Sequence, residues 1–192
     1  TTEIYTLSLH DALPILPPGR PIVSDIDSES YHVSEYIDSF LKPLACLHGA
    51  YLKDTTDFLT KLRQTNATQN CLLVTLDVES LYTNIDTASG LRAVRKAFND
   101  NPCPLRKDNE ILKLLELCLK GGDFEFGDDK YLQVSGTAMG KKFAPNYANI
   151  FMAEWEKNAI GRSPLKPEFY KRFLDDIFLI WQHGLDALLE FL

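Results

Sequence analysis

The chain has 192 residues, of which 45% are hydrophobic and 24% are charged. A chain of this size buries roughly 70% of its unfolded surface, enough for one globular domain or two subdomains without disulfide or metal support. The net charge of −7 argues against a generic basic nucleic-acid-binding protein, but it allows a site in which carboxylates hold cations. The four cysteines form no C-x-x-C pair, which argues against a zinc site, and no apolar stretch is long enough to span a membrane.

Residues 1–15 (TTEIYTLSLHDALPI) match the in-frame translation of a common sequencing adapter. A match of this length makes a natural strand or helix the weaker interpretation. We therefore predict that residues 1–15 are non-native, and we base no prediction of fold or function on them.

The remaining sequence alternates between helical and strand patterns. In chain order, the predicted elements are a helix over 33–44, a helix over 54–62 with Phe58, Leu59 and Leu62 facing inward, a strand over 71–76, a helix capped by Thr87, a helix capped by Asp108, a hairpin over 124–134, a helix opened by Pro145, a hairpin over 169–181 and a helix begun at Asp186. The continuous apolar run at 71–76 is typical of a strand buried on both faces. This order predicts an α+β fold with one mixed sheet.

Acidic residues occur in two otherwise apolar places. Asp77 ends the strand over 71–76, and the pair Asp175-Asp176 interrupts the hairpin over 169–181. If the strand lies beside the hairpin, three carboxylates meet at one spot, where they would repel each other unless cations lie between them. Mg²⁺ prefers oxygen ligands of this kind. The residues alone leave open the alternative that Asp175-Asp176 is merely a turn, because aspartate favours turns.

Three segments resemble the palm motifs of reverse transcriptases, in the order of that family. They are residues 76–82 (LDVESLY), residues 136–145 (GTAMGKKFAP) and residues 173–176 (FLDD), and residues 19–24 (GRPIVS) resemble the fingers motif upstream. Within the family, the sequence is most similar to Penelope-like retroelements. The segments that carry this similarity include LDVESLYTNI, GTAMGKKFAPNYANIFM and FLDDIFLIW. The resemblance covers residues 16–192.

The resemblance implies an α+β right-hand polymerase palm, in which helices pack on a mixed or antiparallel sheet, together with partial fingers. It places the partial fingers at residues 16–70 and the palm at residues 71–192. We expect the chain to stop after the catalytic hairpin, without the thumb and without any endonuclease domain of the same polyprotein.

The resemblance also implies the catalytic site. Asp77, Asp175 and Asp176 would be the catalytic acids and would bind two Mg²⁺ ions, or Mn²⁺ in their place, with the backbone carbonyl of Val78 as a further metal ligand. The two ions would clamp the attacking and leaving oxygens of an in-line phosphoryl transfer.

The implied substrate-binding residues lie in the same motifs. Tyr82 would be a steric gate that excludes a 2′-hydroxyl, Arg20 would contact the incoming triphosphate, Gly136 and Gly140 would allow close approach of nucleotide and template, Met139 would lie at the nucleotide, and Lys141 and Lys142 would contact phosphate. The alternatives are a core tyrosine at Tyr82 and simply solvated charges at Arg20, Lys141 and Lys142.

Two positions depart from the pattern of many relatives. Met139 stands where these have glutamine, and a thioether cannot donate a hydrogen bond as an amide does. Phe173 stands where many have tyrosine. Both changes are compatible with the Penelope-like branch.

We therefore expect an RNA-directed DNA polymerase that extends a DNA primer on an RNA template with dNTPs, inside the cell and in the nucleus. One alternative is an inactive retroelement relic. Another is an RNA-directed RNA polymerase, which the bulky ring of Tyr82 disfavours. Gly127-Asp128-Asp129 matches the GDD of such polymerases, but it precedes the glycine motif, and we interpret it as a turn.

Overall fold

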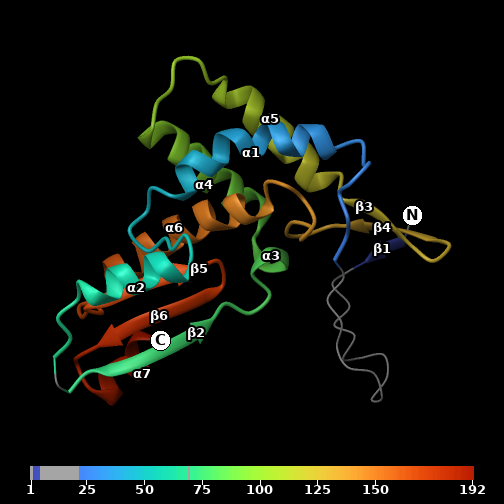
Figure 1. Cartoon of the computed structure of the whole chain (residues 1–192). Helices are drawn as coiled ribbons and strands as arrows, with labels where there is room; N and C mark the ends of the chain where they lie inside the picture. Colours follow the sequence, from blue (N-terminus) through green and yellow to red (C-terminus); the bar gives the residue numbers. More distant parts are fainter. Residues whose placement is uncertain (1, 5–21, 69) are drawn as a thin grey trace, which may run out of the picture.

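The computed structural model describes residues 2–4, 22–68 and 70–192 (Figure 1). The described helices are α1 (Tyr31–Ala45), α2 (Thr55–Arg63), α3 (Leu81–Asn84), α4 (Thr87–Asp100), α5 (Asp108–Lys120), α6 (Ala144–Arg162) and α7 (Leu185–Phe191). The described strands are β1 (Thr2–Ile4), β2 (Leu72–Asp77), β3 (Asp123–Phe126), β4 (Asp129–Gln133), β5 (Phe169–Phe173) and β6 (Asp176–Trp181). The predicted hairpins and long helices are confirmed, whereas the short helix α3 was not predicted.

The strands form two separate sheets, so the prediction of one mixed sheet is wrong. One sheet has the order β2-β6-β5 and is antiparallel throughout, and the other has the order β1-β4-β3. The two sheets are separate because the β3–β4 hairpin follows α5 and lies at the end of the helical layer away from the β2-β6-β5 sheet (Figure 1). There β4 pairs in parallel with β1, which lies in the adapter-like segment.

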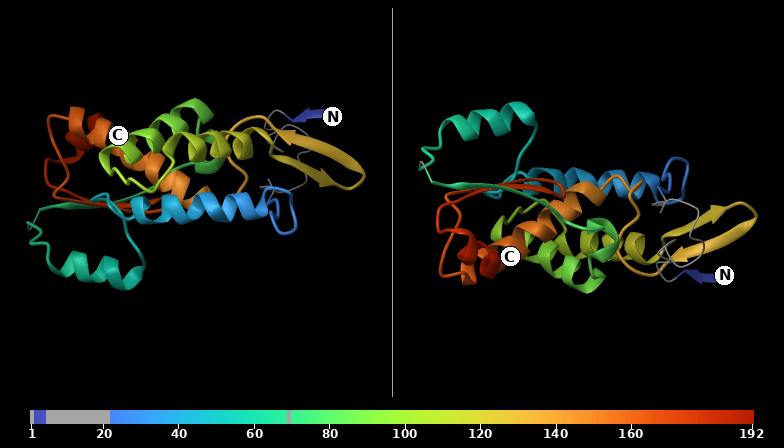
Figure 2. Two further views of the ribbon diagram at one scale, coloured as in Figure 1. Left: turned by 90° about the horizontal axis from the view of Figure 1, so that it is seen from above. Right: turned by 90° about the horizontal axis from the view of Figure 1, so that it is seen from below.

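The β2-β6-β5 sheet has one covered face and one partly open face. Even-numbered residues of β2 pack with Leu179 and Trp181 against α7, while Phe58 of α2 contacts Phe169 and Phe178 on the other face. Figure 2 shows the sheet nearly edge-on between α2 and the layer that contains α6 and α7.

The prediction that the strand over 71–76 is buried on both faces is therefore wrong. β2 is an edge strand, α2 covers only the part of the open face formed by β5 and β6, and the side chain of Leu73 is 68% exposed. Leu59 of α2, expected to point inward, is exposed, since it is the adjacent Phe58 that packs on the sheet.

The helices α1, α4, α5 and α6 share the main hydrophobic core. Its fully buried members include Ile37, Val94, Leu115 and Tyr147, one from each of these helices. Burial of such side chains supplies most of the driving force for folding. The core thereby fixes the start of α6 and the loop that precedes it. No helix in the described ranges is long and apolar enough to cross a membrane.

Two predicted helix caps lie one residue away from the observed caps. The cap of α4 is Asp86 rather than Thr87, because the Asp86 carboxylate accepts hydrogen bonds from both the amide and the hydroxyl of Ser89. Asp108 is the first residue of α5, and Lys107 occupies the cap position.

Candidate active site

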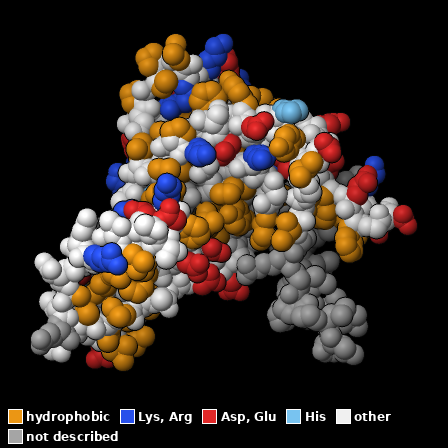
Figure 3. All heavy atoms as spheres, in the orientation of Figure 1, with side chains coloured by type: hydrophobic (Ala, Val, Ile, Leu, Met, Phe, Trp, Pro, Cys, Tyr) orange, Lys and Arg blue, Asp and Glu red, His pale blue; other side chains and the backbone are white. Residues whose placement is uncertain are grey.

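The β2-β6-β5 sheet brings Asp77, Asp175 and Asp176 to the same end. Asp77 and Asp176 are paired across the antiparallel ladder, so their side chains project from the same face of the sheet. Asp175 lies in the β5–β6 turn, and its carbonyl accepts a hydrogen bond of 3.0 Å from the amide of Val78. This amide fixes the segment after β2 against the turn. Figure 3 shows a group of acidic side chains on the surface at this end of the sheet.

The chemistry of these groups suits a hard divalent cation. Asp77 and Asp176 are exposed, and among the described residues none of the three carboxylates has a hydrogen-bond or ion-pair partner. Carboxylate and carbonyl oxygens, here including Val78, are the ligands that Mg²⁺ takes in proteins. The backbone placement fits a shared ion, although in the described ranges no three acidic, histidine or cysteine side chains converge closely enough to hold one.

Tyr82 lies on α3, within range of the Asp175 charge. The turn that leads from Asp77 into α3 includes Ser80 in a left-handed conformation, with φ of 52°. Burial of the half-buried Tyr82 ring, together with the neighbouring carboxylate of Asp175, raises the pKa of the phenol. The ring packs at the margin of the helical core and also lies close to Asp175.

The glycine loop over 134–143 packs directly on α3. The amide of Thr137 donates a hydrogen bond of 2.8 Å to the carbonyl of Tyr82. Gly136 has φ of 71°, and a Cβ atom there would lie 2.4 Å from the Tyr82 carbonyl oxygen. Gly140 is equally crowded, since a Cβ atom would lie 1.7 Å from the carbonyl oxygen of Val23. Both glycines therefore permit close approach of the chain's own backbone. The sequence-based expectation concerned contacts of these glycines with nucleotide and template, and it stays a prediction.

The two lysines of this loop have different surroundings. Lys141 is buried, and its ammonium lies 2.7 Å from Asp25 Oδ1 and also donates to Ser30. Lys142 is exposed, with its ammonium 5.5 Å from the centre of the Tyr31 ring. The expectation of a solvated or phosphate-binding Lys141 is therefore corrected, because its charge is engaged inside the protein. Met139 lies half-buried in the same loop. Arg20, expected at the triphosphate, lies outside the described residues.

The Lys141 pair sets the charge state of Asp25. Burial alone would raise the pKa of this carboxyl group, but hydrogen bonds from Lys141 and Ser28 and the charge of Lys141 outweigh burial and lower the pKa. Asp25 is therefore ionised at neutral pH. Asp25 directly follows residues 19–24, which resemble the fingers motif, so its pair with Lys141 links that region to the glycine loop.

Sequence reasoning missed a buried polar cluster behind the acids. Arg172 of β5 is fully buried and pairs with Glu156 of α6, and it also bonds to Asn149. Two signals were available in the sequence. Arg172 stands among aromatic residues three positions before Asp175, and Asn149 and Glu156 lie seven residues apart, on one face of a helix.

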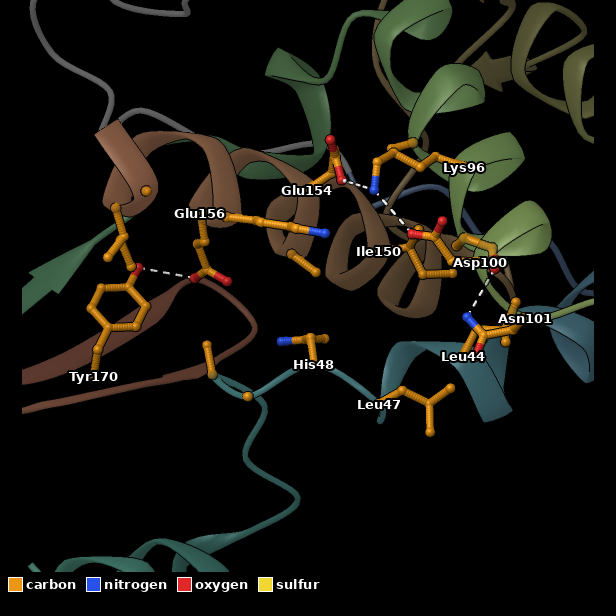
Figure 4. A pocket seen from close by; sticks show the side chains of 18 of the residues that line it. Leu44, Leu47, His48, Lys96, Asp100, Asn101, Ile150, Glu154, Glu156 and Tyr170 are labelled. Carbon is orange, nitrogen blue, oxygen red and sulfur yellow. Dashed lines mark hydrogen bonds and ion pairs between the residues drawn. The ribbon is translucent and has the colours of Figure 1, made fainter. Parts of the chain in front are cut away.

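A cavity of about 630 Å³ lies elsewhere, between the end of α1, α4 and α6 (Figure 4). Burial, and the nearby charge of Arg172, lower the pKa of His48 on its wall to about 4, so this ring is neutral at pH 7. Lys96 in the same cavity is paired with Asp100 and Glu154. None of the three sheet-end acids lines the cavity.

Comparison with known proteins identifies the fold. No family model and no curated protein matches the chain. Among solved structures, the apo telomerase of Candida tropicalis truncated from its C-terminal domain superimposes with a TM-score of 0.58 and 12% identity, over 86% of this chain and 36% of that one. The telomerase of Candida albicans, in complex with a TWJ fragment of telomeric RNA, gives 0.62 and 10%, over 82% and 32%. The chain therefore shares its fold with the matching part of these telomerases.

This shared fold agrees with the predicted α+β class of helices packed on antiparallel strands. A further neighbour, the telomerase of Candida tropicalis with a TWJ fragment of telomeric RNA, has a TM-score of 0.57 at 12% identity, over 86% of this chain and 30% of that one. The chain thus spans about a third of the length of these neighbours.

Proposed function

We propose that the chain is the fingers-to-palm part of an RNA-directed DNA polymerase of a Penelope-like retroelement. The observation that carries the proposal is the placement of Asp77, Asp175 and Asp176 at one end of an antiparallel sheet within a reverse-transcriptase-like fold. Residues 16–70 would belong to the fingers and residues 71–192 to the palm.

The proposed reaction is attack of a primer 3′-hydroxyl on the α-phosphorus of a dNTP, with pyrophosphate as the leaving group. Asp77, Asp175, Asp176 and the carbonyl of Val78 would hold two Mg²⁺ ions. When bound, the ions supply positive charge at the attacking and leaving oxygens, and no covalent enzyme intermediate is needed.

The residues around the acids would orient the substrates. Tyr82, next to Asp175, would exclude a 2′-hydroxyl by the size of its ring, which favours deoxynucleotides. The open face of the sheet, with Thr75 and Leu73 exposed along β2, lies beside Asp77 and offers a surface for the primer–template duplex. Exposed Lys142 is the lysine of the glycine loop that remains available for a phosphate.

RNA is the proposed template. Two of the structural neighbours are telomerases in complex with a fragment of telomeric RNA, which supports an RNA partner for the same fold. A DNA primer, dNTPs and Mg²⁺ complete the proposed set of partners.

The test is primer extension by the longest open reading frame that contains residues 16–192, with an RNA template, dNTPs and Mg²⁺. We expect extension by the wild type and its loss in Asp175→Asn. The matched control is Asp128→Asn, because Asp128 is an exposed turn acid outside the site and should leave extension unchanged. Extension that survives Asp175→Asn refutes the assignment of the acids.

Cation binding separates the polymerase from the inactive relic. Titration with Mn²⁺, followed by its paramagnetic resonance signal, should show saturable binding that Asp175→Asn and Asp77→Asn weaken and Asp128→Asn does not. A wild type that neither binds Mn²⁺ at these acids nor extends a primer supports the relic.

A further inference from the structure

Arg172 is a permanently charged side chain in the interior of the protein. It lies on β5 with 0% of its surface exposed, on the sheet face that is covered by α6. A guanidinium stays charged at any pH that a protein tolerates, so it is costly to bury unless nearly all of its N–H groups find acceptors. The acceptors around Arg172 therefore indicate what the residue does.

One set of acceptors comes from α6. Arg172 Nε donates to Glu156 Oε1 at 2.6 Å, and Nη1 donates to Asn149 Oδ1 at 2.8 Å. Tyr170 adds a hydrogen bond of 2.9 Å from its hydroxyl to the same Glu156 oxygen. These contacts hold the plane of the guanidinium in one orientation, because a fork of donors matched to fixed acceptors leaves little rotational freedom.

The remaining acceptor is the turn that carries the acids. Nη1 of Arg172 also donates to the carbonyl of Leu174 at 2.7 Å. Leu174 has φ of 54°, a left-handed conformation that a leucine adopts only where surrounding contacts hold it. The next residue, Asp175, accepts the Val78 amide through its own carbonyl. A continuous set of hydrogen bonds thus runs from α6 through Arg172 and the turn to the end of β2.

We propose that Arg172 is a positioning residue for the catalytic turn. It anchors the Leu174 carbonyl to α6 and thereby sets where Asp175 and Asp176 stand relative to Asp77. The inference rests on the proposed polymerase function for its catalytic consequence, whereas its structural part can be measured without catalysis.

The contact to Leu174 distinguishes positioning from a simple buried ion pair. An ion pair between Arg172 and Glu156 could be exchanged for two apolar side chains with little effect on stability. Such an exchange still removes the only donor that the described structure gives the Leu174 carbonyl. The double variant R172M/E156L is therefore the informative change, because it leaves no unpaired charge in the core while it frees the turn.

The test compares this double variant with the wild type and with K171M, each in the longest open reading frame that contains residues 16–192. Lys171 is the adjacent basic residue on the same strand, and its side chain points to the opposite face, so K171M controls for loss of charge on β5. For R172M/E156L we expect kcat to fall roughly 10- to 100-fold, as is usual when the groups that orient metal ligands are lost. KM for dNTP should stay within about twofold, and half-maximal activity should require more Mg²⁺.

Amide hydrogen exchange at Val78 reports the turn directly, because its acceptor is the Asp175 carbonyl. We expect exchange at Val78 to become at least about tenfold faster in R172M/E156L, with exchange in the α1 and α4 core unchanged. R172K is the second variant if the double variant unfolds, since a lysine can still pair with Glu156 but cannot reach Leu174 at the same time, and the same acceleration is expected.

Unchanged Val78 exchange together with unchanged kcat overturns the inference. If the wild type shows no extension at all, the proposed function fails, and the Val78 exchange still decides whether Arg172 holds the turn. An equal loss of Val78 protection in K171M would also overturn it.

Discussion

Replacement of Lys141 by methionine tests the buried pair that joins the glycine loop to the segment over 22–30. The side chains of Lys141 and Asp25 are 9% and 3% exposed, and Asp25 Oδ2 already lacks a hydrogen-bond partner among the described residues. Methionine fills a similar volume but leaves the Asp25 carboxylate without its cation. Loss of one partner of a buried pair costs about 3–5 kcal/mol, and we adopt about 3 kcal/mol because Ser28 and Ser30 still donate hydrogen bonds to Asp25.

The assay is urea unfolding of K141M, D25N and the double variant D25N/K141M. We expect K141M to lose about 3 kcal/mol, and the double variant to lose less than the sum of the single changes, because it buries no unpaired charge.

The pair also predicts how stability changes with pH. The pair lowers the pKa of Asp25 below its ordinary 3.8, so its contribution to wild-type stability is present above about pH 4 and is lost as pH falls below that value. In K141M burial, the largest influence, is opposed only by serine hydroxyl groups such as those of Ser28 and Ser34, so the pKa of Asp25 rises above its wild-type value and the gain in stability above about pH 4 should shrink.

Two results would refute this reasoning. One is a loss in K141M of less than about 1 kcal/mol, the value of an ordinary exposed pair. The other is the same pH profile in K141M as in the wild type.

Three further predictions concern the glycine loop, the covered face of the sheet and Tyr82. G140A should lower the unfolding free energy by at least about 2 kcal/mol in urea, since the new Cβ would lie 1.7 Å from the backbone oxygen of Val23, and unchanged stability would contradict that contact. W181A should cost about 3–5 kcal/mol, because Trp181 is fully buried, while L73A on the open face should stay within about 0.5 kcal/mol, and equal losses would contradict the one-sided burial of the sheet. Y82A should raise ribonucleotide incorporation in primer extension, and an unchanged ratio of ribonucleotide to deoxynucleotide incorporation would remove the gate role from Tyr82.

The local pattern of the sequence predicted the secondary structure well. The hairpin that carries Asp175 and the helix opened by Pro145 are both present, because apolar periodicity and proline act within a few residues. The adjacency of Asp77 to the hairpin joins segments far apart in the chain, so the residues alone gave it only as a condition; the resemblance to reverse transcriptases implied it, and the pairing of β2 with β6 confirms it.

What failed depends on contacts between distant segments. The burial of Lys141 is decided by Asp25, 116 positions away, and no local pattern reports such a partner. The sequence shows β2 as a uniformly apolar run, but whether Leu73 is covered depends on how far α2 extends over the sheet. Arg172 was overlooked because its acceptors lie on α6 and in a turn, and these meet only in the folded chain.

Side chains of β2 alternate between the two faces of the sheet, so an insertion in this strand has a different effect from a substitution. Val74 and Leu76 face α7 while Thr75 and Asp77 face the opposite way, so substitution of Thr75 alters the open surface and leaves the core intact. A single inserted or deleted residue before Asp77 would exchange the two sets, which would turn the carboxylate toward the apolar layer and the leucine toward solvent. The length of this strand is therefore under stricter constraint than the identity of Leu73 and Thr75.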